Sequence, residues 1–451
     1  MIQRYALPEM AALWTAESTY ETWVRVEVLA STAQAGIGVV PDEALADIRR
    51  APVPPVARIR ELEAERDHEI LAFLAAYTET MPADSARWVH HGMTSYDLVD
   101  TAQGYLLARS MDLVLDAARS FTRILTDRAL EHWDTVCIAR THGIHAEPTS
   151  FGHKLAVHAL AMSRCLTRLA DARTAVAVGT VSGPVGTYSH ISPQVEEYVC
   201  GELGLGTEPI PTQVVARDRH AQLLSALAIT GAVVEQFALE MRMLQRTEVR
   251  EVDEPRTSAY QGSSAMPHKR NPTTSERLCG LARVLRANAG AAYENVALWH
   301  ERDLAHSSVE RIVLPDSLTI AHYQLVSAAA VIRGLEVFPE RMARNIDETH
   351  GLVHSSEVFL GLVADGAERE HAYRLVQAAA DETWRTKVPL ADALAIRGVA
   401  VPADLLDPRR FLTNRNHLKS RLEALSDRLG EEAGEEISEE PSKEPHQHVE
   451  V

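Results

Sequence analysis

Apolar residues recur at three- and four-residue steps through five long stretches of the chain, which is the spacing of an α-helix. These stretches are residues 98–131, 152–179, 216–250, 273–297 and 315–337. Strand patterns are weak and few. Stretches of this length exceed the roughly 8 to 20 residues of an ordinary globular helix, and their apolar faces are broad. We therefore predict an all-α protein built on a long helical bundle that other subunits continue.

The same pattern predicts four parts along the chain. Residues 1–97 form a small N-terminal helical domain, residues 98–350 the long central bundle and residues 351–430 a C-terminal helical domain. The tail, residues 431–451, is acidic and contains two prolines with few large apolar side chains. Such a composition cannot bury a core, so we expect the tail to be disordered.

Composition and charge narrow the possible functions. The 451 residues carry a formal net charge of −18, which argues against a nucleic-acid or anionic-membrane partner. A local basic pocket can still hold an anionic substrate. No run of about 18 apolar residues and no signal-peptide pattern is present, and the cysteines match no zinc or CxxC spacing. We expect a cytoplasmic protein whose four cysteines are small buried residues: Cys137, Cys165, Cys200 and Cys279.

Polar segments interrupt the helical pattern at residues 67–69, 90–97, 140–152, 262–272 and 299–312. Each has a simple structural interpretation. Ser95 or Asp97 could cap the helix that follows, and His68 alone could be a surface or capping residue. His142 and His145 are more simply two unrelated histidines than a metal site, because no HExxH motif or carboxylate set accompanies them.

Together these segments favour chemistry on an anion. Residues 262–272, GSSAMPHKRNP, offer two hydroxyls, two cations and an amide, and their glycine and prolines forbid a regular helix. Residues 299–312 carry two arginines nine positions apart with serines between them. Such groups bind anions, and a histidine flanked by hydroxyls, as in 140–152, can transfer protons near neutral pH. The residues alone predict an all-α enzyme that acts on a polyanionic small molecule by acid–base chemistry.

At these residues the sequence resembles the adenylosuccinate lyases, a branch of the fumarase/aspartase superfamily. Residues 262–272 resemble the superfamily signature. The branch is indicated by RTHGIHAEPTSFG at 140–152, VSGPVGTYSHI at 181–191, TQVVARDRHA at 212–221 and ENVALWHERDLAHSSVERIVLPDS at 294–317. The similarity runs from Arg4 to about residue 425. It implies a three-domain all-α fold, a homotetramer built on the central helices, and active sites that each collect segments from three subunits.

The reaction implied by the resemblance is β-elimination of fumarate in purine nucleotide biosynthesis. Adenylosuccinate would give AMP, and the succinyl-carboxamide imidazole ribotide (SAICAR) would give AICAR. The resemblance implies Ser263 as the base, on a mobile loop hinged at Gly262, and His142 as the acid that protonates the departing nitrogen. His68 would be a second catalytic histidine near the phosphate. No metal or organic cofactor is implied.

The resemblance also implies which residues bind the substrate. The succinyl carboxylates would be held by Thr94, Ser95, Thr141, Lys269 and Asn271, and Gln213 would also contact substrate. The nucleotide phosphate would be held by Arg4, Tyr5, Arg302, Ser307 and Arg311.

Four segments depart from the family pattern. Asp67-His68-Glu69 stands where the family has Arg-His-Asp, and Tyr96 stands where it has Thr or Ser. PRTSAYQG at 255–262 replaces a stretch that resembles FAKGQKG, and Ser356-Glu357 replaces Gln-Arg. Three of the four departures remove positive charge.

The departures leave two alternatives open. One is a relative that removes fumarate from a different aspartate adduct in secondary metabolism. The other is an inactive tetrameric scaffold or binding protein, against which the presence of Ser263, His142, Lys269 and Asn271 counts.

Overall fold

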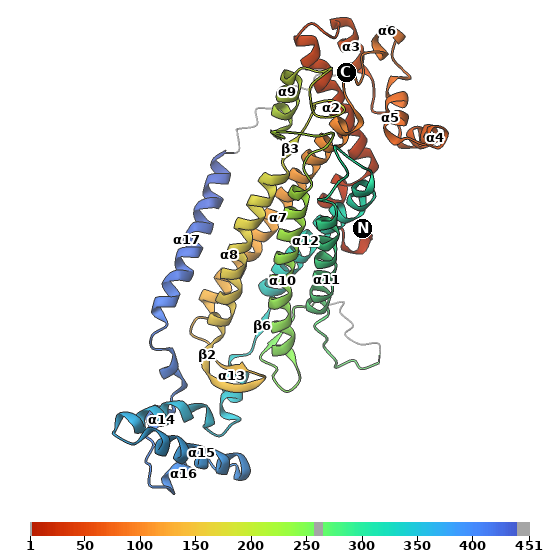
Figure 1. Ribbon diagram of the computed structural model, residues 1–451. Coiled ribbons are helices and arrows are strands. Elements are labelled where there is room, and N and C mark those ends of the chain that lie inside the picture. The colour runs from red at the N-terminus through yellow and green to blue at the C-terminus, as the bar shows by residue number, and fades with distance from the viewer. Residues whose placement is uncertain (1, 257–264, 440–451) are drawn as a thin grey trace. The chain divides into compact units, whose positions relative to one another are not determined.

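The computed structural model describes residues 2–256 and 265–439 and is mainly helical over them (Figure 1). The all-α fold class is confirmed. The five long periodic stretches correspond to α7 (Ser95–Glu131), α8 (Phe151–Val176), α10 (Asp218–Gln245), α11 (Thr273–Glu294) and α12 (Ala305–Arg333). Among the described residues, α10 is the one helix long and apolar enough to cross a membrane. Half of its most apolar window is buried, as in the core helix of a bundle.

Shorter helices and a few short strands complete the described chain. The helices are α1 (Pro8–Leu13), α2 (Ala16–Gly36), α3 (Asp42–Arg50), α4 (Val56–Arg66), α5 (Glu69–Thr78), α6 (Ala83–Ala86), α9 (Pro193–Leu203), α13 (Pro339–Asp347), α14 (Ser355–Ala364), α15 (Arg369–Thr386), α16 (Leu390–Ala395) and α17 (Asn416–Glu439). The 3₁₀ turns are η1 (Gln3–Tyr5), η2 (Leu352–His354), η3 (Ala403–Leu406) and η4 (Pro408–Leu412).

The strands form three two-stranded pairs. They are the antiparallel β1 (Val136–Thr141) with β2 (Ile144–Ser150), the parallel β3 (Val178–Gly179) with β4 (Gly206–Thr207), and the antiparallel β5 (Val252–Asp253) with β6 (Glu336–Val337).

Helix α12 begins earlier than its apolar pattern predicts. The carboxylate of Asp303 accepts the backbone N–H of Ala305 at 2.7 Å, which satisfies one of the free donors of the first turn. The helix then runs through Pro315, whose ring removes one backbone donor. The polar segment 299–312 is therefore a turn followed by the first turns of a long helix.

The chain divides into two compact units that each combine several segments. The first unit comprises residues 1–118, 164–234 and 280–326, and the second comprises residues 119–163, 235–279 and 327–451. In the first, Tyr20, Trp23 and Phe73 make edge-to-face and stacked ring contacts in the core. Each unit joins segments that are in contact although they are far apart in the sequence. The division of the sequence into four consecutive parts stays a prediction.

Helix α17 continues into the part of the chain that we expected to be disordered. It runs to Glu439, whereas the acidic tail was predicted to begin at residue 431. Glutamate and alanine are good helix formers, and the first proline of the tail is Pro441. Residues 440–451 lie outside the described residues.

Candidate active site

An open cleft in the first unit brings together many of the predicted site residues. This cleft, which we call the arginine cleft, has a volume of about 750 Å³. Its walls come from the junction of α4 and α5, the first turn of α7 and the start of α12. The predicted site residues that line it are His68, Ser95, Arg302, Ser307 and Arg311.

Arg302 lies in the turn before α12 and is held by two neutral partners. Its guanidinium carbon stands 3.6 Å from the centre of the Tyr96 ring, a cation–π contact. Its Nη1 donates to Gln213 Oε1 at 2.9 Å, and the Gln213 amide nitrogen donates to the carbonyl of Pro184. Neither of these two partners carries a charge that would pair with the guanidinium. The structure thus places Gln213 beside a predicted phosphate residue.

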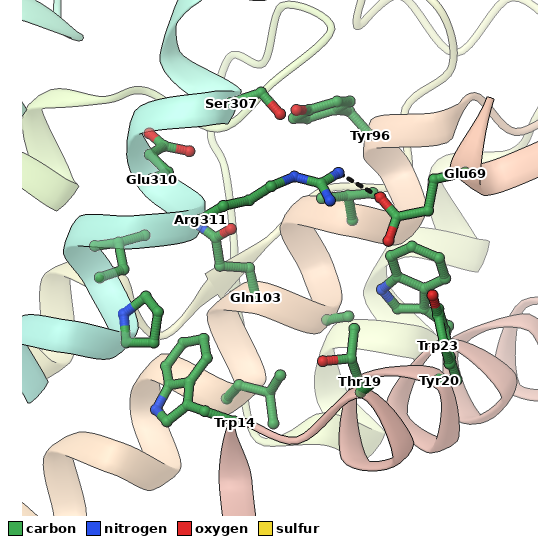
Figure 2. A pocket seen from close by; sticks show the side chains of 16 residues that line it. Trp14, Thr19, Tyr20, Trp23, Glu69, Tyr96, Gln103, Ser307, Glu310 and Arg311 are labelled. Atoms are coloured by element: carbon green, nitrogen blue, oxygen red, sulfur yellow. Dashed lines mark hydrogen bonds and ion pairs between the residues drawn. The ribbon is translucent and has the colours of Figure 1, made fainter. Parts of the chain in front are cut away.

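Arg311 lies on α12, one turn after Ser307, and forms an ion pair with Glu69 from the start of α5 (Figure 2). Burial opposes the positive charge, but the hydrogen bond and the charge of Glu69 outweigh it and raise the pKa of Arg311. Departures from the family pattern therefore contact both arginines of the cleft, Tyr96 at Arg302 and Glu69 at Arg311.

His68 caps the N-terminus of α5. Its Nδ1 accepts the backbone N–H of Leu71 at 3.3 Å, and Asp67 before it adopts a left-handed conformation with φ of 51°. Accepting this bond requires an unprotonated Nδ1, so Nε2 is the ring nitrogen left for a substrate. The capping interpretation is confirmed, and a catalytic role for His68 stays a prediction.

The backbone at Thr94, next to Ser95, is fixed by the buried carboxylate of Asp97. One oxygen accepts the backbone N–H of Thr94 at 2.8 Å, and the other accepts the N–H of Ser182 at 2.8 Å. Asp97 therefore caps the start of α7, as one interpretation of the sequence proposed, and also joins it to segment 181–191. Arg4 and Tyr5 lie in η1, where Tyr5 packs against Tyr323, and neither lines the arginine cleft.

An inner cavity of about 250 Å³ adjoins the arginine cleft and shares Glu69, Tyr96, Ser307 and Arg311 with it. The rings of Tyr20 and Trp23 line one side of this cavity and α12 lines the other, and the ring of Trp14 also contributes to the lining (Figure 2). The Glu69–Arg311 ion pair therefore lies where an aromatic cavity meets an open polar cleft.

A buried ionic cluster in the first unit supports α12. The guanidinium of Arg217 binds Asp100 through two bonds of 2.6 and 2.9 Å and Glu310 through bonds of 3.0 and 3.2 Å. Burial would raise the pKa of Glu310, but a hydrogen bond from His220 and the charges of His220 and Arg217 lower it to about 2. Glu310 is therefore ionised at neutral pH, and its bonds to Arg217 fix the helix that carries Ser307 and Arg311.

Substituting Arg217 with methionine should lower the free energy of unfolding by about 3–5 kcal/mol, because two carboxylates would remain buried without their cation. Urea unfolding followed by circular dichroism would measure the change. In the control, Arg58→Met, the partners are solvent-exposed glutamates, so the unfolding midpoint should barely move. Equal midpoints for the two variants would contradict a supporting role for the cluster.

In the second unit, His142 occupies the tip of the β1–β2 hairpin. Thr141 pairs with Ile144, so the turn consists of His142 and Gly143, with φ of 53° and 81°. Two positive φ angles identify the two-residue turn that suits the twist of a hairpin, and histidine tolerates that conformation better than most residues. Thr141 and His142 are both exposed at this tip. The hairpin thus projects the predicted acid into solvent.

Lys269 and Asn271 line a second, basic pocket, which lies in the second unit and contains about 940 Å³. Asp253 pairs with Arg256 and with Arg270, the latter at 3.1 Å. Glu254 accepts the backbone N–H groups of Thr274 and Ser275 and caps α11. These acids fix the chain on both sides of the signature segment. Ser263, Gly262 and most of 255–262 lie outside the described residues.

Some pocket residues were missed by the sequence interpretation. Glu276 in the first turn of α11 and Arg246 near the end of α10 line the basic pocket with Lys269. Gln103 on α7 lines the inner cavity with a buried amide nitrogen that has no hydrogen-bond partner among the described residues. Each sits within a regular helical pattern, so no local signal separates it from an ordinary helix surface.

Ser356 and Glu357, the fourth departure from the family pattern, also form side-chain bonds. Ser356 donates to Glu147 at 2.7 Å, and Glu357 pairs with Arg410 at 3.3 Å, all in the second unit. Within the described ranges, no group of three or more His, Cys, Asp and Glu side chains could hold a metal ion.

Comparison with known proteins identifies the family of this chain. A family model described as "Lyase" matches residues 3–286, and one described as "Adenylosuccinate lyase C-terminus" matches residues 351–422. The chain is 47% identical to the adenylosuccinate lyase of Bacillus subtilis over 87% of this chain and 91% of that protein. It is 43% identical to the adenylosuccinate lyase of a Synechocystis species, over 94% of this chain and 100% of that protein. The chain belongs to the adenylosuccinate lyase family. It is accordingly a carbon–nitrogen lyase.

Solved structures of other enzymes show the same fold. A fumarate lyase from a Mesorhizobium species superposes with a TM-score of 0.85 at 27% identity, covering 94% of this chain and 99% of that one. The 3-carboxy-cis,cis-muconate lactonizing enzyme of Pseudomonas putida gives 0.85 at 26% identity, covering 94% and 98%. The adenylosuccinate lyase fold seen here is therefore that of the wider superfamily.

Proposed function

We propose that this protein eliminates fumarate from adenylosuccinate to give AMP, and from SAICAR to give AICAR, in purine nucleotide biosynthesis. The observation that carries the proposal is the arginine cleft, where Arg302, Ser307 and Arg311 line one wall near Ser95 in a member of this family. Two guanidinium groups and hydroxyls suit a phosphate. No metal or organic cofactor takes part in the proposal.

The proposed chemistry divides proton transfer between two residues. Ser263 removes the proton from the carbon beside a succinyl carboxylate, and His142 protonates the nitrogen as the carbon–nitrogen bond breaks. Negative charge grows on that carboxylate, so donors fixed around it lower the barrier. Lys269, Asn271 and the hydroxyls of Thr94, Ser95 and Thr141 supply them, with Gln213 holding Arg302 in place.

The substrate assay is direct. Purified protein should release fumarate and AMP from adenylosuccinate, followed as a change in ultraviolet absorbance, and fumarate from SAICAR. Fumarate from another aspartate adduct, with none from adenylosuccinate, would identify a relative with a different substrate. No fumarate from any adduct would favour a scaffold.

The proposal includes a homotetramer in which several subunits complete each site. Exposed apolar side chains on long helices support it, because a lone chain would leave them in water. On α10 they are Ile229, Leu239 and Met243, each about 45% exposed, and on α11 Val284 and Tyr293. The four cysteines are free and buried, which supports a reducing cytosol.

Mixing two inactive variants tests the shared site. If His142 and Ser263 of one site come from different subunits, co-refolded His142→Asn and Ser263→Ala chains should regain part of the wild-type activity. Each variant alone should stay inactive under the same treatment, and light scattering should report four chains per particle. No recovery from a mixed tetramer would mean that one subunit supplies both residues.

A further inference from the structure

The arginine cleft carries an unusual charge balance for a site that binds an anion. Three carboxylates line it, those of Glu63, Asp67 and Glu69, against the two guanidinium groups of Arg302 and Arg311. A dianionic phosphate entering the cleft therefore meets a wall with more negative than positive groups.

The two arginines differ in how they are engaged. Arg302 touches a ring face and an amide oxygen, so its charge remains available to a ligand. Arg311 has its charge matched by Glu69. The side chain of Arg311 is 61% exposed and that of Glu69 is 18% exposed, so a solute in the cleft can reach the guanidinium while Glu69 approaches it from the protein. An anion at Arg311 must therefore displace the carboxylate or sit beside it.

We propose that Glu69 is a specificity-determining residue that competes with the phosphate of the substrate for Arg311. The inference rests on the proposed function, in which Arg311 holds that phosphate. Competition lowers the affinity for a phosphate-bearing substrate and leaves the affinity for its phosphate-free counterpart unchanged. The wild-type protein therefore discriminates less between a nucleotide and a nucleoside than Arg302, Ser307 and Arg311 would without Glu69.

The length of the Glu69 side chain and the identity of residue 67 bear on this inference. Glutamate stands where the family pattern has aspartate, one methylene shorter. Asp67, two residues before Glu69, stands where the family pattern has an arginine. This replacement also weakens anion binding, because it removes a cation from the cleft and adds a carboxylate. Asp67 lowers the positive charge of the cleft, and the extra methylene of Glu69 lengthens the side chain whose carboxylate pairs with Arg311. Their combined effect is a cleft that tolerates a phosphate rather than one that selects it strongly.

Glu69→Gln tests the competition, because glutamine keeps the size and the acceptor oxygen but removes the charge. The measured quantity is the ratio of kcat/KM for adenylosuccinate to kcat/KM for succinyladenosine, which lacks the phosphate. This ratio should rise by about two- to fivefold in Glu69→Gln, the range for one partly exposed charge pair. The ratio for Glu69→Asp should lie between those of the wild-type protein and Glu69→Gln. Added salt should shrink the difference, because it screens the competing carboxylate.

Glu65→Gln is the matched control, since Glu65 is an exposed residue of α4 outside the cleft lining. It should leave the ratio unchanged. Thermal unfolding would show that all variants are folded. A ratio that is unchanged or lower in Glu69→Gln would overturn the proposal and make Glu69 a residue that positions Arg311 for its ligand.

Calorimetric titration with AMP and with adenosine separates this inference from the proposed function. If no variant releases fumarate but AMP binds about two- to fivefold more tightly to Glu69→Gln, the competition is supported and the proposed reaction is not. Adenosine should bind both proteins equally. AMP binding that is equal in both, or absent from both, would overturn the competition.

Discussion

Replacing Ser263 with alanine should lower kcat for fumarate release by at least about 10³-fold, near the upper range for loss of a proton-transferring side chain. The substrate proton is attached to carbon and is weakly acidic, so no group in bulk water replaces a positioned base efficiently. KM should change little, since the carboxylates and the phosphate keep their binding groups. Steady-state kinetics with adenylosuccinate would measure both constants.

Ser264→Ala is the matched control for that experiment. It removes a hydroxyl from the next residue of the same segment, so a general effect on the segment would appear in both variants. We expect Ser264→Ala to keep activity within about an order of magnitude of wild type. Light scattering should show the same particle mass for both variants. Near-normal turnover by Ser263→Ala would remove serine from the role of base.

The long helices could be predicted from the sequence because their signal is local. Apolar spacing placed α7, α8 and α11 within a few residues of their observed bounds. It missed the start of α12, because that start depends on a polar cap at Asp303 rather than on apolar spacing. It also ended the C-terminal helical domain at residue 430, although α17 continues to Glu439.

Residues that line the arginine cleft could be named from the sequence, but their partners could not. Glu69 and Arg311 are separated by 242 residues, and no local pattern predicts that they form an ion pair. By helical spacing alone, the charged residues of segment 299–312 would most simply form a solvated helix face. This holds for Arg311, which is exposed, but not for Glu310, which is buried against Arg217. Such burial depends on α10 and α12 packing together, which composition does not reveal.

Replacing His142 with asparagine should lower kcat by about 10²- to 10⁴-fold, because the departing nitrogen would lose its proton donor. Asparagine is the suitable replacement, since it tolerates the positive φ of 53° at this turn and preserves the hairpin. Ile144→Ala, at an exposed position on the same turn, should retain most activity. A good leaving group depends least on protonation by the acid. The His142→Asn variant should therefore lose less activity on an adduct whose departing amine is more acidic. An equal loss for both adducts, or none, would assign the acid to another residue.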